Sequence, residues 1–135
     1  MNVNRGEKDS MRSIMIVDDT AFTRLVLRNI FESLGFVVIA EADTGEDAIK
    51  NYCLFKPELV FMDISMPGMN GLNASRKIME IDSDAKIIIC SALVHRETVI
   101  KAIQAGARDF IAKPLQTERI EWAIQNVLGT DMYLQ

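Results

Sequence analysis

Short, nearly continuous apolar runs alternate along the chain with longer segments in which apolar residues recur every three or four positions. Such a run is typical of a strand buried on both faces, whereas the longer spacing is typical of an amphipathic helix. The runs cover residues 14–19, 36–42, 59–63, 87–90 and 110–112. The pattern therefore predicts a doubly wound α/β protein with five parallel strands, right-handed crossovers and helices on both faces of the sheet.

Capping and stop signals define the helices between these strands. The first predicted helix covers 20–34 and ends before Gly35, and the second lies between the N-cap Thr44 and Pro57. The third lies around 72–81, and the fourth ends at 105 before Gly106. The last begins at the N-cap Thr117 and ends at about 128. In the second helix the apolar spacing predicts a buried face made of Ala48, Ile49, Tyr52 and Phe55.

The length of 135 residues suits a single domain with one hydrophobic core, and we place this domain at residues 13–129. Residues 1–12 are polar, and we expect them to form a disordered extension. Residues 130–135 form a short tail after the last helix. No internal repeat or linker interrupts the alternation of strands and helices.

Charge and hydropathy exclude several function classes. Fifteen Lys and Arg against nineteen Asp and Glu give a net charge of −4 at pH 7, which argues against a nucleic-acid partner. No apolar stretch approaches the roughly 20 residues that cross a bilayer, and the polar start lacks the apolar core of a signal peptide. We therefore expect a cytoplasmic protein without membrane insertion, in which Cys53 and Cys90 are reduced packing residues.

Reactive side chains stand where four of the five strands end. Asp18 and Asp19 end the first run, Asp63 ends the third, Ser91 follows the fourth and Lys113 follows the fifth. Because parallel strands bring their carboxyl ends to one edge of the sheet, where open α/β sheets bind ligands, these five side chains should share one cleft.

Three carboxylates in one cleft repel each other unless a cation accompanies them. Oxygen ligands without thiolate or imidazole suit Mg²⁺, which commonly bridges carboxylates to a phosphoryl group. Lys113 and Ser91 would hold the remaining phosphoryl oxygens, and Asp63, alone on the central run, is the candidate nucleophile for an aspartyl phosphate.

The order of these residues resembles the receiver domain of two-component response regulators. The resemblance lies in Asp18-Asp19, in Asp63 before the loop SMPGMNG, in Ser91-Ala92 and in Lys113-Pro114, and it covers about residues 14–128. It implies a flavodoxin-like receiver fold with strand order 2-1-3-4-5.

The resemblance also implies the roles of the site residues. A phosphoryl group would move from the histidine of a sensor kinase to Asp63, while Mg²⁺ would be held by Asp63, by Asp19 directly and by Asp18 partly through water. The backbone carbonyl of Ser65 would be a further ligand, and Lys113 would pair with the phosphoryl group. The peptide bond before Pro114 would be cis.

A signalling surface follows from the same resemblance. The Ser91 hydroxyl would move toward the phosphoryl group while Phe110, the aromatic of the fifth strand, turns inward. Trp122 lies opposite the buried stripe of the last helix, so it should be exposed. With Val99, Ile103 and Phe110 it is predicted to form an output or dimer surface on the face made by the last two helices and the fifth strand.

Leu93 stands two residues beyond Ser91, where receivers flank the water that hydrolyses the phosphoryl bond. An apolar side chain cannot orient that water, so we expect a long-lived phosphorylated state. Ser65, two residues beyond Asp63, is the other position that varies within the family.

The sequence thus favours a stand-alone receiver of chemotaxis type, a signalling switch and not an enzyme, that acts through protein binding as a monomer or a phosphorylation-dependent dimer. A phosphorelay intermediate and a receiver piece of a larger, for example transcriptional, regulator remain alternatives.

Two functions of other classes fit less well. A Mg²⁺-dependent aspartyl phosphotransferase or phosphatase usually carries DxD on its first strand, whereas the first strand here ends in the adjacent pair Asp18-Asp19. In a flavin carrier, carboxylates at the strand ends would repel the flavin phosphate. His95, the only histidine, belongs to no Ser/His/Asp order and receives no role.

Overall fold

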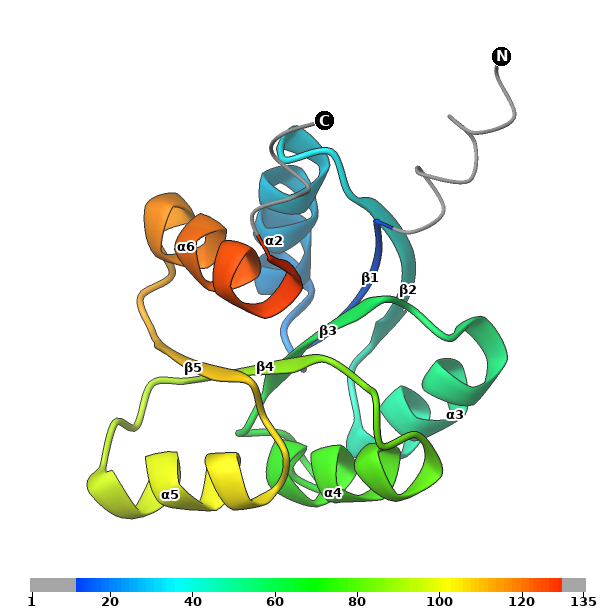
Figure 1. Ribbon diagram of the computed structural model, residues 1–135, viewed down its shortest axis with the longest axis vertical. Helices are drawn as coiled ribbons and strands as arrows, with labels where there is room; N and C mark the ends of the chain where they lie inside the picture. The colour runs from blue at the N-terminus through cyan, green and yellow to red at the C-terminus, as the bar shows by residue number, and fades with distance from the viewer. Residues whose placement is uncertain (1–11, 130–135) are drawn as a thin grey trace.

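The computed structural model describes residues 12–129, within which five strands alternate with five helices (Figure 1). The strands are β1 (Ser13–Val17), β2 (Val37–Ala42), β3 (Leu59–Asp63), β4 (Ile87–Ser91) and β5 (Asp109–Ala112). The helices are α2 (Ala21–Ser33), α3 (Gly45–Phe55), α4 (Gly71–Ile81), α5 (Arg96–Gln104) and α6 (Thr117–Leu128). The predicted extension and tail lie outside the described residues, apart from Arg12.

All neighbouring strands are parallel and follow the order β2-β1-β3-β4-β5, which confirms the predicted topology. Figure 1 shows α2 and α6 on one face of the sheet and α3, α4 and α5 on the other. In the register, Val17 pairs with Met62, Asp63 with Cys90 and Ser91 with Ala112. The carboxyl ends of the four strands that precede the predicted site residues are therefore aligned at one edge.

Alternation along the strands divides the core into two layers. Ile14, Ile16 and Phe61 pack with Leu27 and Phe31 of α2 and with Ile120 and Ile124 of α6. Their neighbours Met15, Val17 and Met62 pack on the other face with buried residues of α3, α4 and α5. Because both sides of β1, β3 and β4 are covered, every residue of these strands is buried, and only their ends are free to carry polar chemistry.

Three sequence expectations are wrong in detail. Gln116, not Thr117, is the N-cap of α6, because Gln116 keeps an extended backbone and the helical turn begins only at Thr117. Phe55 is exposed, because it ends α3 where the chain turns at Lys56 in a left-handed conformation. Cys53 is exposed and does not pack, whereas Cys90 is buried as expected, and both thiols are free.

The described chain contains no helix that is long and apolar enough to cross a membrane.

The loop after Asp63 closes on a glycine that begins α4. The Gly71 N–H donates to the Ile64 carbonyl at 2.9 Å. A Cβ placed on Gly71 would lie 2.0 Å from the carbonyl oxygen of Asp63, so only glycine lets α4 begin this close to the end of β3.

Gly71→Ala should therefore lower the free energy of unfolding by about 1–3 kcal/mol, the range for overpacked sites, measured by urea denaturation. The matched control is Asn73→Ala, since Asn73 is exposed in the same helical turn and surface changes of this kind stay within about 0.5 kcal/mol. Equal unfolding midpoints for the two variants would contradict the close approach.

Candidate functional site

Three carboxylates meet at the carboxyl edge of the sheet. Asp18 and Asp19 follow β1, and Asp63 is the last residue of β3. One oxygen from each lies within 4.8 Å of the other two. Asp18 and Asp63 are buried, with 1% and 2% of their surface exposed, while Asp19 is open to solvent. The cluster predicted from the strand ends is therefore present, with one accessible and two enclosed acids.

Lys113 joins this cluster from the end of β5. Its Nζ lies 3.2 Å from Asp18 Oδ2 and 3.4 Å from Asp63 Oδ1. Its backbone N–H donates to the Ser91 carbonyl at 2.9 Å, and the Lys113–Pro114 peptide bond is cis, as the resemblance implied. The ammonium thus contacts acids from two other strands of the sheet.

Burial and charge act in opposite directions on these groups. Burial raises the pKa of Asp63 above its ordinary value, and the neighbouring Asp18 and Asp19 carboxylates add to this effect, while Lys113 opposes it. Burial lowers the pKa of Lys113, but attraction to Asp63 and Asp18 outweighs burial and leaves the pKa raised. The lysine therefore stays charged, and it only partly compensates the cost of ionising Asp63.

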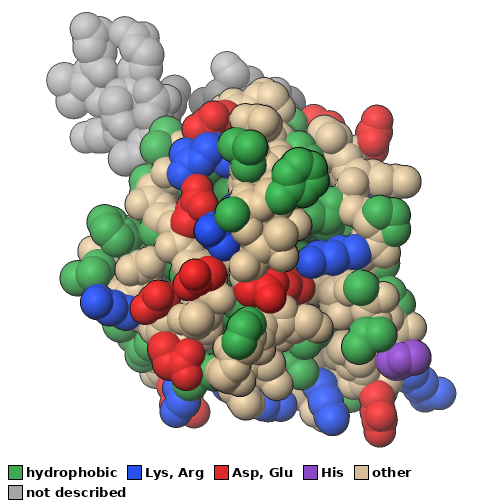
Figure 2. Space-filling view, turned by 180° about the vertical axis from the view of Figure 1, so that it is seen from behind, with side chains coloured by type: hydrophobic (Ala, Val, Ile, Leu, Met, Phe, Trp, Pro, Cys, Tyr) green, Lys and Arg blue, Asp and Glu red, His purple; other side chains and the backbone are tan. Residues whose placement is uncertain are grey.

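The donor set suits a hard divalent cation such as Mg²⁺. The available groups are carboxylate oxygens, with one acid reachable from solvent. Cys90 pairs with Asp63 in the sheet register, but its thiol is buried and burial raises its pKa, so no thiolate competes as a ligand. On the face in Figure 2, Asp and Glu side chains gather across the middle, and Lys and Arg side chains lie beside them.

Hydrogen bonds hold Asp18 from several sides. Its N–H donates to the Ala42 carbonyl at 3.0 Å, and its Oδ1 accepts from the Thr20 N–H at 2.9 Å. Its own carbonyl accepts from Arg24 Nη1 at 2.6 Å. Asp19, in contrast, accepts only a long hydrogen bond, 3.4 Å, from the Thr20 hydroxyl among the described contacts.

The other predicted site residues lie at or just after the ends of β3 and β4. Ser91 ends β4 with 1% of its surface exposed, and its Oγ accepts from the Leu93 N–H at 3.0 Å. Leu93 is exposed, and Ser65 is exposed in the loop after Asp63. The roles given to Ser65, Ser91 and Leu93 stay predictions.

Three of the four predicted output residues meet at a separate groove of about 430 Å³ between α5, β5 and α6. Val99, Ile103 and Phe110 line it together with Val94 and Arg119. Phe110 is half-buried and packs against the core, so its side chain is neither fully inward nor fully exposed.

Trp122 does not line this groove, but it is exposed, as predicted. The Arg119 guanidinium lies 5.0 Å from the centre of its ring, and it also pairs with Asp109 and donates to the Phe110 carbonyl. Arg119 therefore connects Trp122 to the groove.

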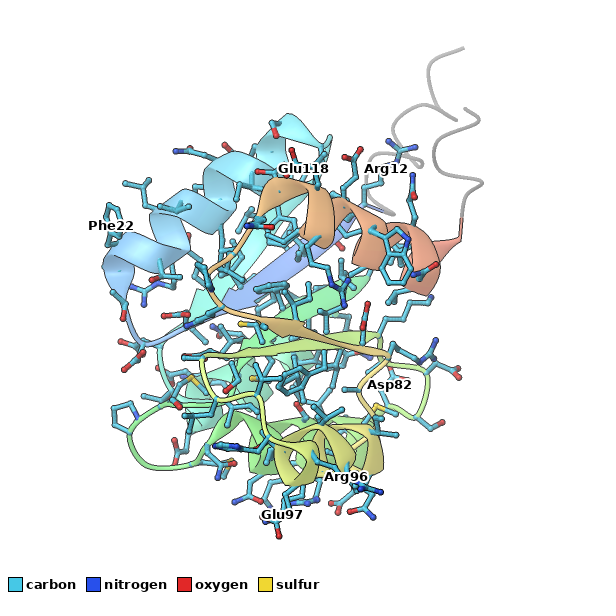
Figure 3. All side chains as sticks on the ribbon, turned by 90° about the vertical axis from the view of Figure 1, so that its left-hand side faces the viewer. Arg12, Phe22, Asp82, Arg96, Glu97 and Glu118 are labelled. Carbon is cyan, nitrogen blue, oxygen red and sulfur yellow. The ribbon has the colours of Figure 1, made fainter. Side chains whose placement is uncertain are left out.

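Sequence reasoning missed Arg24 and Glu41. Arg24 contacts Asp18 and pairs with Glu41 of β2. A contact between residues 17 positions apart leaves no periodic signal. Phe22, an apolar residue of the predicted first helix, is exposed and projects from the first turn of α2 (Figure 3).

Comparisons with known proteins agree with this geometry. Residues 14–125 match the family model of the response regulator receiver domain. The chain is 47% identical over 116 residues to the chemotaxis protein CheY of Thermotoga maritima and 49% identical over 116 residues to CheY of Bacillus subtilis. Each alignment covers 86% of this chain and 97% of the relative.

A solved structure of a CheX-CheY-BeF3-Mg²⁺ complex from Borrelia burgdorferi contains a similar chain. The TM-score is 0.84 at 36% identity, over 86% of this chain and 88% of that one. The strand order and the family match thus lead to the same assignment, and the chain belongs to the response regulator receiver domain family.

Proposed function

We propose that the chain is a chemotaxis-type receiver that accepts a phosphoryl group on Asp63 and signals by binding a protein partner. The observation that supports this most directly is the cluster of three carboxylates within 4.8 Å, two of which are in contact with Lys113. The chemotaxis assignment is supported by the CheY relatives, which this chain matches over nearly their whole length.

In this proposal a sensor histidine kinase supplies the phosphoryl group. A carboxylate oxygen of Asp63 attacks the phosphorus, the bond between phosphorus and the kinase imidazole nitrogen breaks, and that nitrogen keeps the electron pair. Asp18, Asp19, Asp63 and the Ser65 carbonyl would hold Mg²⁺, which neutralises charge on the phosphoryl oxygens when it is bound.

The remaining steps belong to side chains of the chain itself. The Lys113 ammonium already contacts Asp63, so it would pair with a phosphoryl oxygen on that residue. The Ser91 hydroxyl, which accepts a hydrogen bond from Leu93, has its own proton available to donate to another oxygen. Both groups would oppose the negative charge that transfer brings into the cleft.

Output would use the groove between α5, β5 and α6. Apolar Val99, Ile103 and Phe110 form a concave surface beside the charged Arg119 and the exposed Trp122, a combination typical of protein interfaces. A phosphorelay role and a place within a larger regulator remain alternatives with the same chemistry. The family assignment favours a receiver over a phosphatase that acts on small substrates.

Phosphorylation should add one phosphoryl group to the wild-type protein in the presence of Mg²⁺ and acetyl phosphate, measured by intact mass. Asp63→Asn should gain none, because an amide is not a nucleophile here, and wild type with EDTA should gain none or far less. A wild-type mass that stays unchanged with Mg²⁺ would contradict the proposed function.

Asp63→Asn should raise the free energy of unfolding at pH 7 without metal, measured by urea denaturation. The pKa of Asp63 in the folded protein lies above its ordinary value near 3.8, so its ionised form destabilises the fold. The advantage of the variant should shrink as the pH falls through the folded pKa toward 3.8, because the wild-type carboxyl becomes protonated.

Two controls test this electrostatic cause. Mg²⁺ should raise the unfolding temperature of the wild type more than that of Asp63→Asn, because it relieves the same repulsion. Asp109→Asn should gain no stability, since Asp109 forms an ion pair with Arg119. A gain in both Asn variants would mean that the effect is not specific to the cleft.

Leu93→Asn should shorten the lifetime of the phosphorylated protein several-fold, because an amide can orient the hydrolytic water and the exposed leucine cannot. The decay of the phosphorylated mass after removal of the phosphodonor gives the rate. Leu93→Met is the matched apolar control and should decay like the wild type. An unchanged rate in Leu93→Asn would refute the role of this position.

A further inference from the structure

Arg24 connects the candidate metal site to the edge strand of the sheet. Its Nη1 donates to the Asp18 carbonyl at 2.6 Å, and its Nε donates to Glu41 Oε1 at 3.0 Å. The side chain is only 19% exposed, so the guanidinium is held between α2, β2 and the end of β1. These two hydrogen bonds come from different nitrogens of one planar guanidinium, an arrangement that the single ammonium of a lysine cannot reproduce.

The Asp18 carbonyl belongs to the peptide unit that joins Asp18 to Asp19. The Asp18 N–H and carboxylate have partners of their own, in Ala42, Thr20 and Lys113. The Asp19 carboxylate is exposed and, within residues 12–129, accepts only the long hydrogen bond from the Thr20 hydroxyl. The orientation of the Asp19 side chain therefore depends on its backbone. Arg24 holds that backbone by its hydrogen bond to the carbonyl of the Asp18–Asp19 peptide.

Charge alone would make an arginine unfavourable beside a cation site. Here Glu41 accepts from both Arg24 and Arg28, and Arg28 also pairs with Glu32. Two cations and two acids leave this network formally neutral, so its contact with Asp18 can orient the peptide without a net positive charge to repel the metal.

We propose that Arg24 is a positioning residue of the metal site, which places the Asp19 carboxylate for Mg²⁺ by holding the Asp18–Asp19 peptide. This inference rests on the proposed function, because it assumes that the carboxylates bind Mg²⁺. Groups that orient metal ligands without touching the metal change affinity by about tenfold or more when they are removed.

The test compares Arg24→Met with Arg28→Met. Each removes one positive charge and one ion pair with Glu41. Arg28→Met also removes the pair with Glu32, whereas only Arg24→Met removes the hydrogen bond to Asp18. Calorimetric titration with MgCl₂ should give a dissociation constant about tenfold weaker for Arg24→Met, and one within about twofold of wild type for Arg28→Met. The amide resonance of Asp19 in metal-free protein should shift only in Arg24→Met.

Phosphorylation kinetics separate positioning from general damage. In Arg24→Met the Mg²⁺ concentration for half-maximal phosphorylation by acetyl phosphate should rise, while the rate at saturating Mg²⁺ stays near the wild-type value. Should Arg24→Met fail to fold, Arg24→Lys keeps the charge but lacks the fork of donors, and it should also bind Mg²⁺ more weakly.

Several outcomes would overturn the inference. Wild-type Mg²⁺ binding by folded Arg24→Met would mean that this residue does not position the site. Tighter binding would mean that its charge, and not orientation, is its effect. Wild-type binding by Arg24→Lys would contradict the need for two donors, and equal losses in both Met variants would assign the effect to the ion-pair network. A wild-type protein that binds no Mg²⁺ would refute the proposed function itself.

Discussion

The contact of Lys113 with Asp18 and Asp63 is the interaction on which the site depends. Two acids that are almost fully enclosed would repel each other strongly, and burial already makes ionisation of Asp63 unfavourable. The ammonium from β5 reduces this cost only because β1, β3, β4 and β5 end at the same edge. The buried strands therefore fix the position of the charges, and the charges leave a need for a further cation.

Much of the fold and of the carboxylate cluster could be predicted because both follow from one rule. Strands buried on both faces must be apolar throughout, so Asp63 at the end of LVFMD marks the point where the chain leaves the core. Parallel connections then bring Asp18, Asp63 and Lys113 to the same edge of the sheet. The order of the strands along that edge came from the resemblance to receiver domains.

The details that the sequence did not supply depend on contacts between distant residues or on helix ends. The bonds of Arg24 to Glu41 and to the Asp18 carbonyl join elements whose relative position appears only after folding. The cap of α6 at Gln116 and the exposure of Phe55 depend on where the backbone turns, which side-chain propensity describes weakly. The periodic pattern identifies buried faces, but it does not report such polar contacts.

The site and the groove are joined by a short stretch of chain. Ser91 ends β4 at the edge of the sheet that holds the carboxylates, its Oγ accepts from the Leu93 N–H, and Val94, one residue further, already lines the groove. On the neighbouring strand, Lys113 donates its N–H to the Ser91 carbonyl, and Phe110 lies three residues before Lys113. In the proposed function, a Ser91 hydroxyl drawn toward a phosphoryl group on Asp63 would alter the Leu93 hydrogen bond, so a small movement in the cleft would change the wall of the groove.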